Sequence, residues 1–185
     1  AADAGTVTVS DHHYSVGKKM WTWGDGPFGH AWGANLTDNG DRYIELMTGV
    51  YTDNQPDFSY IMPGETKEFT QVWFPVRGIG EVKNASIDGA VSLEIDGDLV
   101  RFGGIPTAAH TDAVLRLYQG GNLVFETIAD IAPDAPITGS MVMDAPVLTD
   151  LRIELAAGGK VLVAYQPKKG GRKPPEARPV PPRPA

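Results

Sequence analysis

The sequence predicts an all-β protein. Period-two alternation of apolar and polar residues, the pattern of a half-buried strand, begins at residues 5–10 and recurs along the chain. Short β-rich runs in the C-terminal half are separated by glycine-containing turns every 8–12 residues or so, which is typical of an immunoglobulin-like antiparallel sandwich. No segment combines a 3.6-residue apolar period with helix caps, so we expect little helix.

The first part of the chain is expected to contain separate strands joined by long connections. Residues 5–10 and 42–50 alternate as strands. Between them, residues 24–40 are rich in glycine, aspartate and asparagine, which indicates a long structured loop rather than a helix. Residues 56–63 follow as a turn-rich return.

A tight turn and a further strand complete this part. Proline fixes φ and glycine tolerates positive φ, so Met62-Pro-Gly-Glu65 predicts a tight turn. Residues 68–76 alternate as a strand that Pro75 is expected to end. Trp73 lies in this regular strand and is expected to belong to the core.

The second part is expected to be the sandwich. Its strands are predicted at 91–95, 99–102, 113–118, 123–128, 138–142, 151–155 and 160–165. Turns are predicted at 96–98, 119–122 and 157–159, where glycine recurs. The expected domains are therefore 1–78, 79–166, and a Pro/Lys/Arg-rich linker at 167–185 that favours extended polyproline geometry.

Composition excludes several functional classes. The chain has a net charge of −7, yet residues 168–185 hold six basic residues and one acidic residue, so the rest is strongly acidic. We therefore expect no nucleic-acid partner, because phosphate binding needs a basic face. The absence of cysteine excludes disulfides and thiolate chemistry and leaves the compartment open. No apolar run is long enough for a membrane span, so we expect no membrane-spanning segment. The N-terminus shows no signal peptide and enters a strand-like run directly, so the chain is expected to begin within a larger protein.

Aromatic and polar residues gathered near the start point to carbohydrate. A pyranose has an apolar C–H face that stacks on aromatic rings and a rim of hydroxyls that require hydrogen bonds. Trp21, Trp23 and Trp32 could supply the rings, although such tryptophans are more commonly ordinary core aromatics. The polar turn could supply the hydrogen bonds, although these side chains also stabilise turns by bonding to their own backbone. Its residues are Asp53, Asn54, Gln55 and Asp57.

Glu45 is the candidate for chemistry. It lies within an apolar strand and shares a face with Tyr43 and Met47. A carboxylate on a partly apolar face can serve as a general base or acid near neutral pH. The alternative is a solvated glutamate or one paired with Arg42.

The histidines are not expected to bind a metal, and no cofactor is expected. His12 and His13 are adjacent, which on a strand would send them to opposite faces, and no carboxylate spacing completes a recognisable site. A histidine that donates a proton in a sugar pocket is a further hypothesis, with His12, His13 and His30 as candidates.

The first part resembles a known bacterial family. The segments that carry the resemblance are Trp21-Thr-Trp-Gly24, Asn35-Leu-Thr-Asp38, Tyr43-Ile-Glu-Leu-Met47, Tyr51-Thr-Asp-Asn-Gln-Pro-Asp-Phe58 and Glu65-Thr-Lys-Glu-Phe69. They are similar to the family catalogued as domain of unknown function 5107, closely over residues 5–95 and more loosely to 166. Members look like galactose mutarotase-type β-supersandwiches and are often followed by tetratricopeptide repeats. On this comparison residues 1–78 are the last strands of a supersandwich.

The resemblance implies a role for Glu45. Aldose 1-epimerases carry their catalytic base on a strand in a similar order of features, and Glu45 falls at that position, with Pro56-Asp57 and Pro63-Gly64-Glu65 near the following turns. The histidines that epimerases use lie in a region absent from this chain, and the spacing from Glu45 to Pro56-Asp57 is longer. The fold also hosts domains that bind sugars without catalysis.

Three functions follow as hypotheses. The leading one is a carbohydrate-binding domain within a larger bacterial protein. The second is part of an aldose-epimerase-like or glycoside-processing enzyme with Glu45 as general base or acid, although this chain alone is expected to be inactive. The third is a structural β-module that presents downstream helical repeats to protein partners.

Overall fold

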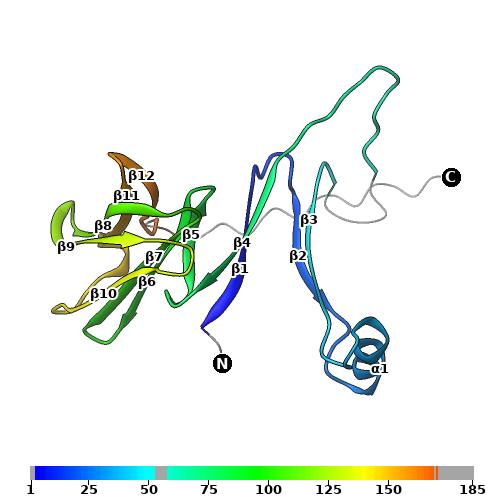
Figure 1. The fold of residues 1–185 in the computed structure, drawn as a ribbon, viewed down its shortest axis with the longest axis horizontal. Coiled ribbons are helices and arrows are strands. Elements are labelled where there is room, and N and C mark those ends of the chain that lie inside the picture. Colours follow the sequence, from blue (N-terminus) through cyan, green and yellow to red (C-terminus); the bar gives the residue numbers. More distant parts are fainter. Residues whose placement is uncertain (1–2, 53–57, 169, 171–185) are drawn as a thin grey trace. The chain divides into compact units, whose positions relative to one another are not determined.

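The chain forms two compact units, Ala1–Val76 and Arg77–Ala185. The structure is a computed structural model that describes residues 3–52, 58–168 and 170. Within the described residues every element is a strand except one α-helix and one short 3-10 helix, so the predicted all-β class is confirmed (Figure 1). Neither helix in this part of the chain has the length and apolar character needed to cross a bilayer.

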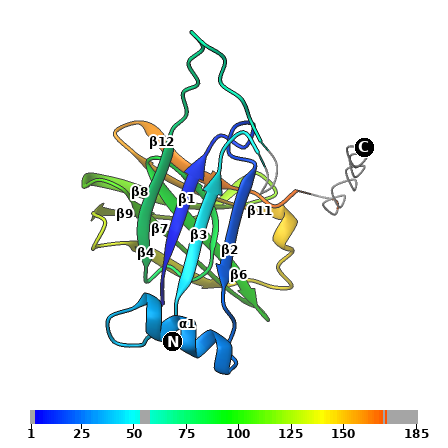
Figure 2. The same cartoon turned by 90° about the vertical axis from the view of Figure 1, so that its right-hand side faces the viewer.

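The first unit contains two separate pairs of strands. Its elements are β1 (Ala4–Ser10), β2 (Gly17–Thr22), α1 (Pro27–Leu36), β3 (Ile44–Gly49) and β4 (Gln71–Arg77), the last residue of which is assigned to the second unit. Strand β1 pairs with β4, and β2 pairs antiparallel with β3 (Figure 2). The side-chain amide of Gln71 donates to the backbone oxygen of Thr48 at 2.7 Å and so links β4 to β3.

Strand β4 differs from its prediction in two ways. It continues through Pro75, because β4 lies at the edge of a two-stranded sheet, where a missing N–H is tolerated. Phe74 and Val76 are the buried residues of this strand, whereas Trp73 is 42% exposed. The prediction that Trp73 lies in the core is therefore wrong, since it falls on the outward side of the alternation.

The tight turn predicted before β4 is confirmed. The Glu65 N–H donates to the Met62 carbonyl at 2.9 Å, and the Glu65 carboxylate accepts from the Met62 N–H at 2.8 Å. Gly64 has φ 81°, the left-handed conformation that glycine adopts without strain.

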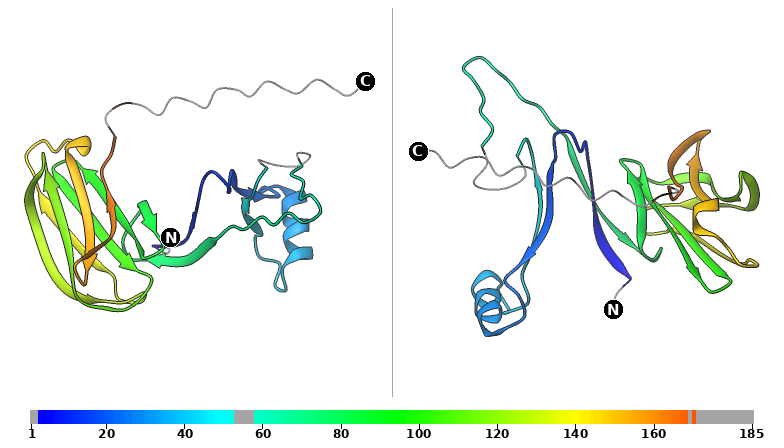
Figure 3. Two further views of the ribbon diagram at one scale, coloured as in Figure 1. Left: turned by 90° about the horizontal axis from the view of Figure 1, so that it is seen from above. Right: turned by 180° about the vertical axis from the view of Figure 1, so that it is seen from behind.

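The second unit is a sandwich of two four-stranded antiparallel sheets, as the sequence predicts (Figure 3). Its elements are β5 (Val82–Ser86), β6 (Gly89–Asp96), β7 (Leu99–Pro106), β8 (His110–Gln119), β9 (Asn122–Ile131), β10 (Ile137–Val142), η1 (Leu148–Asp150), β11 (Leu151–Ala157) and β12 (Lys160–Tyr165). The strand orders are β10-β7-β6-β5 and β12-β11-β8-β9. Consecutive strands β5, β6 and β7 thus form a meander, unlike the immunoglobulin constant domain, where strands B and C lie in different sheets.

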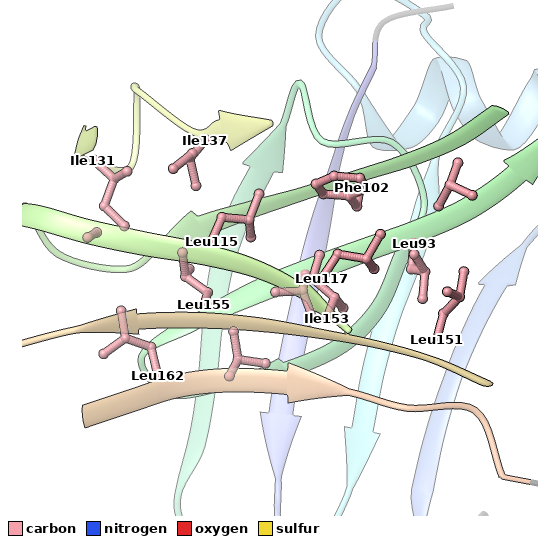
Figure 4. Packing of buried hydrophobic residues seen from close by; sticks show 14 of the residues in the cluster. Leu93, Phe102, Leu115, Leu117, Ile131, Ile137, Leu151, Ile153, Leu155 and Leu162 are labelled. Carbon is pink, nitrogen blue, oxygen red and sulfur yellow. The ribbon is translucent and has the colours of Figure 1, made fainter. Parts of the chain in front are cut away.

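The core of this unit lies between its two sheets. One sheet contributes Leu93 and Phe102, and the other contributes Leu117, Ile153 and Leu155, all of them at most 2% exposed (Figure 4). Their positions follow the period-two alternation of each strand, which places every second side chain on the inner face. Burial of a large aliphatic or aromatic side chain contributes roughly 1.5–3 kcal/mol, so these residues dominate the stability of the sandwich.

All three predicted glycine turns form two-residue hairpins. Asp96 pairs with Leu99 around Gly97-Asp98, and the other two turns are paired glycines. Gln119 pairs with Asn122 and Ala157 with Lys160, which leaves Gly120-Gly121 and Gly158-Gly159 as the turns. All four glycines have φ between 55° and 88°. Positive φ at both central positions defines the type I′ turn, whose twist suits antiparallel strands.

Side chains of β5 join the two sheets along one edge. The Asn84 side-chain amide donates to the Ala164 carbonyl at 2.7 Å, and the Ser86 hydroxyl donates to the Leu162 carbonyl at 2.7 Å. Lys160 and Asp88 add an ion pair of 2.6 Å at the same edge. The edge strands β5 and β12 are therefore held together by polar contacts above the apolar core.

A charged network crosses the sheet β12-β11-β8-β9. Glu154 is 6% exposed and accepts from Arg116 at 3.2 Å and from Arg152 at 2.5 Å. Arg116 also donates to Glu126 at 2.8 Å, and this hydrogen bond raises the pKa of the guanidinium above its usual value. Because a buried carboxylate is costly without partners, the two arginines compensate Glu154.

Candidate functional site

The paired strands β2 and β3 bring an aromatic ring and a carboxylate face to face. Their register sets Trp21 opposite Glu45 and Lys19 opposite Met47. Residues directly opposite on an antiparallel pair project to the same side of the sheet. On this side Glu45 and Met47 are half-buried, whereas Leu46 projects to the other side and is 43% exposed. The apolar-flanked carboxylate therefore lies beside a tryptophan.

Four aromatic rings cluster at the end of this strand pair. Trp21 packs edge-to-face on Trp23, with ring centroids 4.3 Å apart, and Trp23 stacks on Trp32 at 4.6 Å with an interplanar angle of 11°. Phe28 contacts both Trp23 and Trp32 edge-on. Trp23 and Trp32 are half-buried, whereas Trp21 is 37% exposed. Trp21 is thus the predicted tryptophan with the most accessible ring, and one face each of Trp23 and Trp32 is covered.

Helix α1 creates this cluster, so the prediction of a loop over residues 24–40 is wrong for this segment. Proline at the first turn suits a helix start, since its missing N–H would have no helical partner there. Gly29 and Gly33, four residues apart, are the buried residues of α1. A Cβ at Gly29 would lie 2.1 Å from the Gly24 oxygen, and one at Gly33 would lie 2.8 Å from the Asp41 oxygen. The two glycines therefore let the helix pack directly on backbone, which brings Trp32 onto Trp23.

A cavity of about 260 Å³ opens between α1 and the adjoining ends of β2 and β3. It is lined by Thr22, Trp23, Gly24, Asp25, Gly29, His30, Gly33, Gly40, Asp41, Arg42, Tyr43 and Ile44. The Asp25 carboxylate lies 2.5 Å from the Arg42 guanidinium and 3.5 Å from the His30 ring. The cavity thus combines an aromatic wall with a carboxylate and a guanidinium, both largely exposed to solvent. The pairing of Asp25 with Arg42 was not predicted from the sequence, because no local pattern shows that residues on either side of a helix will pair.

The ion pair that Arg42 forms tests the interpretation that Glu45 is paired with Arg42. Arg42 pairs with Asp25, so the interpretation that it pairs with Glu45 is wrong. The Trp23 indole N–H, at the same end of the strands, is buried and has no hydrogen-bond acceptor among the described residues. Glu45 therefore retains hydrogen-bonding capacity that a ligand could use, whereas the buried Trp23 N–H is not accessible to one.

Part of the predicted site cannot be compared with the structure. The polar-turn residues Asp53, Asn54, Gln55 and Asp57 lie outside the described residues, as does almost all of the predicted linker. The structure brings Trp21, Trp23 and Trp32 together and sets Glu45 beside Trp21.

The turn after β1 gathers two histidines and an aspartate, so the prediction that His12 and His13 point to opposite faces of a strand is wrong. Residues 12–14 form a turn rather than a strand, so His12 and His13 do not point to opposite faces. Their ring centroids are 3.9 Å apart. The His13 backbone N–H and its Nδ1 both lie 2.8 Å from the same Asp11 oxygen. These hydrogen bonds hold the pKa of the Asp11 carboxyl below its usual value, so this group is ionised at neutral pH.

Comparison with known protein families divides the chain at the same place as its two units. Residues 2–76 match the family described as Domain of unknown function (DUF5107). Residues 84–165 match a different family, described as YphG-like protein, second domain. The resemblance to DUF5107 predicted from the sequence is thus confirmed, but it ends at residue 76 rather than extending through the sandwich. No solved structure matches the chain.

Proposed function

We propose that this DUF5107 segment binds a carbohydrate on the face of the β2–β3 pair that carries Trp21 and Glu45. The observation that supports this is the cross-strand pair itself. Trp21 offers an accessible ring, and the Glu45 side chain lies directly opposite on the same side of the sheet. A sugar ring that stacks its C–H face on Trp21 would present its edge hydroxyls to Glu45.

The energetics favour such a pair over either residue alone. Aromatic contacts of good geometry contribute about 0.5–1.5 kcal/mol beyond the burial of their area. A hydrogen bond from a hydroxyl to an ionised carboxylate contributes about 1.5–3 kcal/mol. Together these terms can give selective binding of a polar ligand at a half-open surface.

The adjoining cavity extends the proposed site. The Trp23 ring that packs against Trp21 also lines the cavity, so a ligand held on Trp21 has a second polar environment next to it. There the Asp25 carboxylate accepts hydrogen bonds and the Arg42 guanidinium donates them, which matches the mixed donors and acceptors of a sugar. The size of the cavity suits a single small polar group rather than a long chain.

Binding can be tested by calorimetric titration of the chain with a panel of mono- and oligosaccharides. We expect at least one sugar to bind, and Trp21→Ala to weaken it about tenfold, which corresponds to about 1.4 kcal/mol. Glu45→Gln keeps the shape of the side chain and removes its charge, and it should weaken the same sugar about tenfold.

Trp73→Ala is the matched control. Trp73 also lies on a strand of the first unit and is 42% exposed, close to the 37% of Trp21. The Trp73→Ala variant should bind the sugar with the same affinity as the unmodified chain. The proposal is wrong if no sugar in a broad panel binds, or if the Trp73 variant loses as much affinity as the Trp21 variant.

A structural role is the second candidate, and the stacking of Trp23 on Trp32 favours it. Rings that cover each other hold α1 to the strands and are less available to a ligand. On this hypothesis the first unit presents other parts of the protein to partners. Trp32→Ala would then lower the stability of the unit, whereas Trp21→Ala would leave its stability unchanged. Sugar titration separates the two candidates directly.

A further inference from the structure

The turn that follows β1 carries a compact set of metal-binding side chains. Asp11, His12 and His13 each offer one donor atom, and the three atoms lie within 4.8 Å of one another. This set lies on a different part of the first unit from the proposed sugar site and plays no role in it. A carboxylate oxygen with two imidazole nitrogens is a donor set that suits zinc and neighbouring divalent transition metals.

The backbone of the turn explains why adjacent residues converge. The N–H groups of Tyr14 and Ser15 both donate to the Asp11 carbonyl, at 3.2 and 2.8 Å, which closes a helix-like turn immediately after the strand. In such a turn neighbouring side chains no longer alternate between two faces as they do on a strand. His12 and His13 therefore share a side, with their rings 3.9 Å apart.

The turn is anchored at its far end, which limits the entropy lost when an ion binds. Ser15 is 3% exposed, and the Tyr51 N–H donates to the Tyr14 carbonyl at 2.7 Å. The donor side chains themselves are open to solvent, with His13 at 73% and Asp11 at 54% exposure. The backbone is thus fixed while the three side chains can adjust their rotamers without losing packing.

The distances between the donor atoms in this structure are close to the distances between donor atoms around a bound zinc ion. Tetrahedral zinc with bonds of about 2.0–2.1 Å sets neighbouring donor atoms roughly 3.3 Å apart. Asp11 and His13 already bring their donor atoms to 2.8 Å, and the largest separation in the set is no more than 4.8 Å. Side-chain rotation is sufficient to close the remaining gap. The hydrogen bond from the His13 N–H also orients the Asp11 carboxylate, as outer hydrogen bonds do for metal ligands.

We propose that Asp11, His12 and His13 bind a divalent zinc ion, with its fourth position open to water or to an external ligand. Three protein ligands leave the ion accessible at the surface, unlike a closed structural site with four. The site would therefore attach a ligand or a partner's side chain to this turn rather than hold the fold together.

The experiment is a calorimetric titration of the full chain, free of any polyhistidine tag, with zinc chloride at neutral pH. We expect one zinc ion per chain in the unmodified protein. His12→Ala and His13→Ala should each weaken binding at least about tenfold, because each removes one of three ligands. His110→Ala, in the second unit, is the matched control and should leave the affinity unchanged.

A second measurement identifies the ligands independently of affinity. In proton–nitrogen NMR spectra that detect the imidazoles, zinc should shift the signals of His12 and His13 and leave those of His30 and His110 in place. The variants lie in an exposed turn, and their circular dichroism spectra should match that of the unmodified chain. The proposal is overturned if the unmodified chain binds no zinc, if the double variant H12A/H13A binds it equally well, or if other histidines respond instead.

Discussion

Gly29→Ala tests whether the close approach of α1 to backbone builds the candidate site. A Cβ at this position would lie 2.1 Å from the Gly24 oxygen, 2.7 Å from the Gly24 carbonyl carbon and 2.8 Å from the Trp23 oxygen. All three atoms belong to the backbone, so no side-chain rotation relieves the contact. The helix would have to move by roughly 1 Å, since van der Waals contact begins a little above 3 Å.

Two opposing effects set the magnitude. Alanine in place of glycine inside a helix is favoured by about 1 kcal/mol. Overpacking that shifts the backbone costs typically 1–3 kcal/mol, and contacts this short belong at the upper end. The net expectation is a loss of about 2 kcal/mol in the free energy of unfolding of the first unit. The stacking of Trp23 on Trp32 should be disturbed as well, because the two rings lie on opposite sides of the displaced interface.

Tryptophan spectroscopy provides the assay, since all four tryptophans of the chain lie in the first unit. Denaturant unfolding followed by fluorescence reports the stability of that unit, and near-UV circular dichroism reports the packing of the rings. Gly33→Ala should also lower the stability of the first unit, but by less, because its Cβ would meet one backbone atom closely, the Asp41 oxygen at 2.8 Å, and its other contacts are 3.7 Å or longer. Gly26→Ala is the control, since nothing lies within 4 Å and its φ of −90° suits alanine. The reasoning is refuted if Gly29→Ala unfolds at the same midpoint as Gly26→Ala with an unchanged near-UV spectrum.

Three further predictions concern single side chains. Glu154→Gln removes the buried charge that two arginines share, and in thermal denaturation it should lower the free energy of unfolding by about 2 kcal/mol. Glu126→Gln removes a more exposed charge and should lower it by under about 1 kcal/mol. Leu117→Ala leaves a cavity in the core and should lower the free energy of unfolding by about 3 kcal/mol. Leu123, which is 50% exposed, is the control, and its replacement by alanine should lower it by under about 1 kcal/mol. Equal melting temperatures for the two variants would contradict the core assignment. Asp25→Asn breaks an exposed ion pair and should change the free energy of unfolding by less than about 0.5 kcal/mol. It should nevertheless lower the affinity for any sugar found to bind in the titration. An unchanged affinity would exclude the cavity from the site.

The second unit could be predicted from sequence because its determinants are local. Alternation along strands such as β8 and β11 fixes which side chains face inward, and paired glycines at 120–121 and 158–159 fix the hairpins. Strand β5 was missed because it is short and polar and its pairing with β6 shifts register between Val82 and Asn84, which breaks the alternation. The strand order was not predictable either, since it depends on contacts between residues far apart in the chain.

The first unit was harder to predict because its determinants are contacts rather than patterns. Glycine is a poor helix former, so Gly29 and Gly33 argue against a helix locally, although the close backbone contacts they allow are what positions α1. The pairing of Asp25 with Arg42 likewise has no local signature. The grouping of the tryptophans was foreseen, whereas the sugar-binding role of Trp21 and Glu45 stays a prediction.

The contacts between β5 and β12 also bear on how the sandwich meets other chains. A strand at the edge of a sheet exposes unpaired backbone groups, and these can recruit a strand from another molecule. In this sandwich the carbonyls of Leu162 and Ala164 are already occupied by the side chains of Ser86 and Asn84. An incoming strand would have to displace both hydrogen bonds before it could pair along β12. The same side chains that join the two sheets therefore protect this edge from intermolecular strand addition.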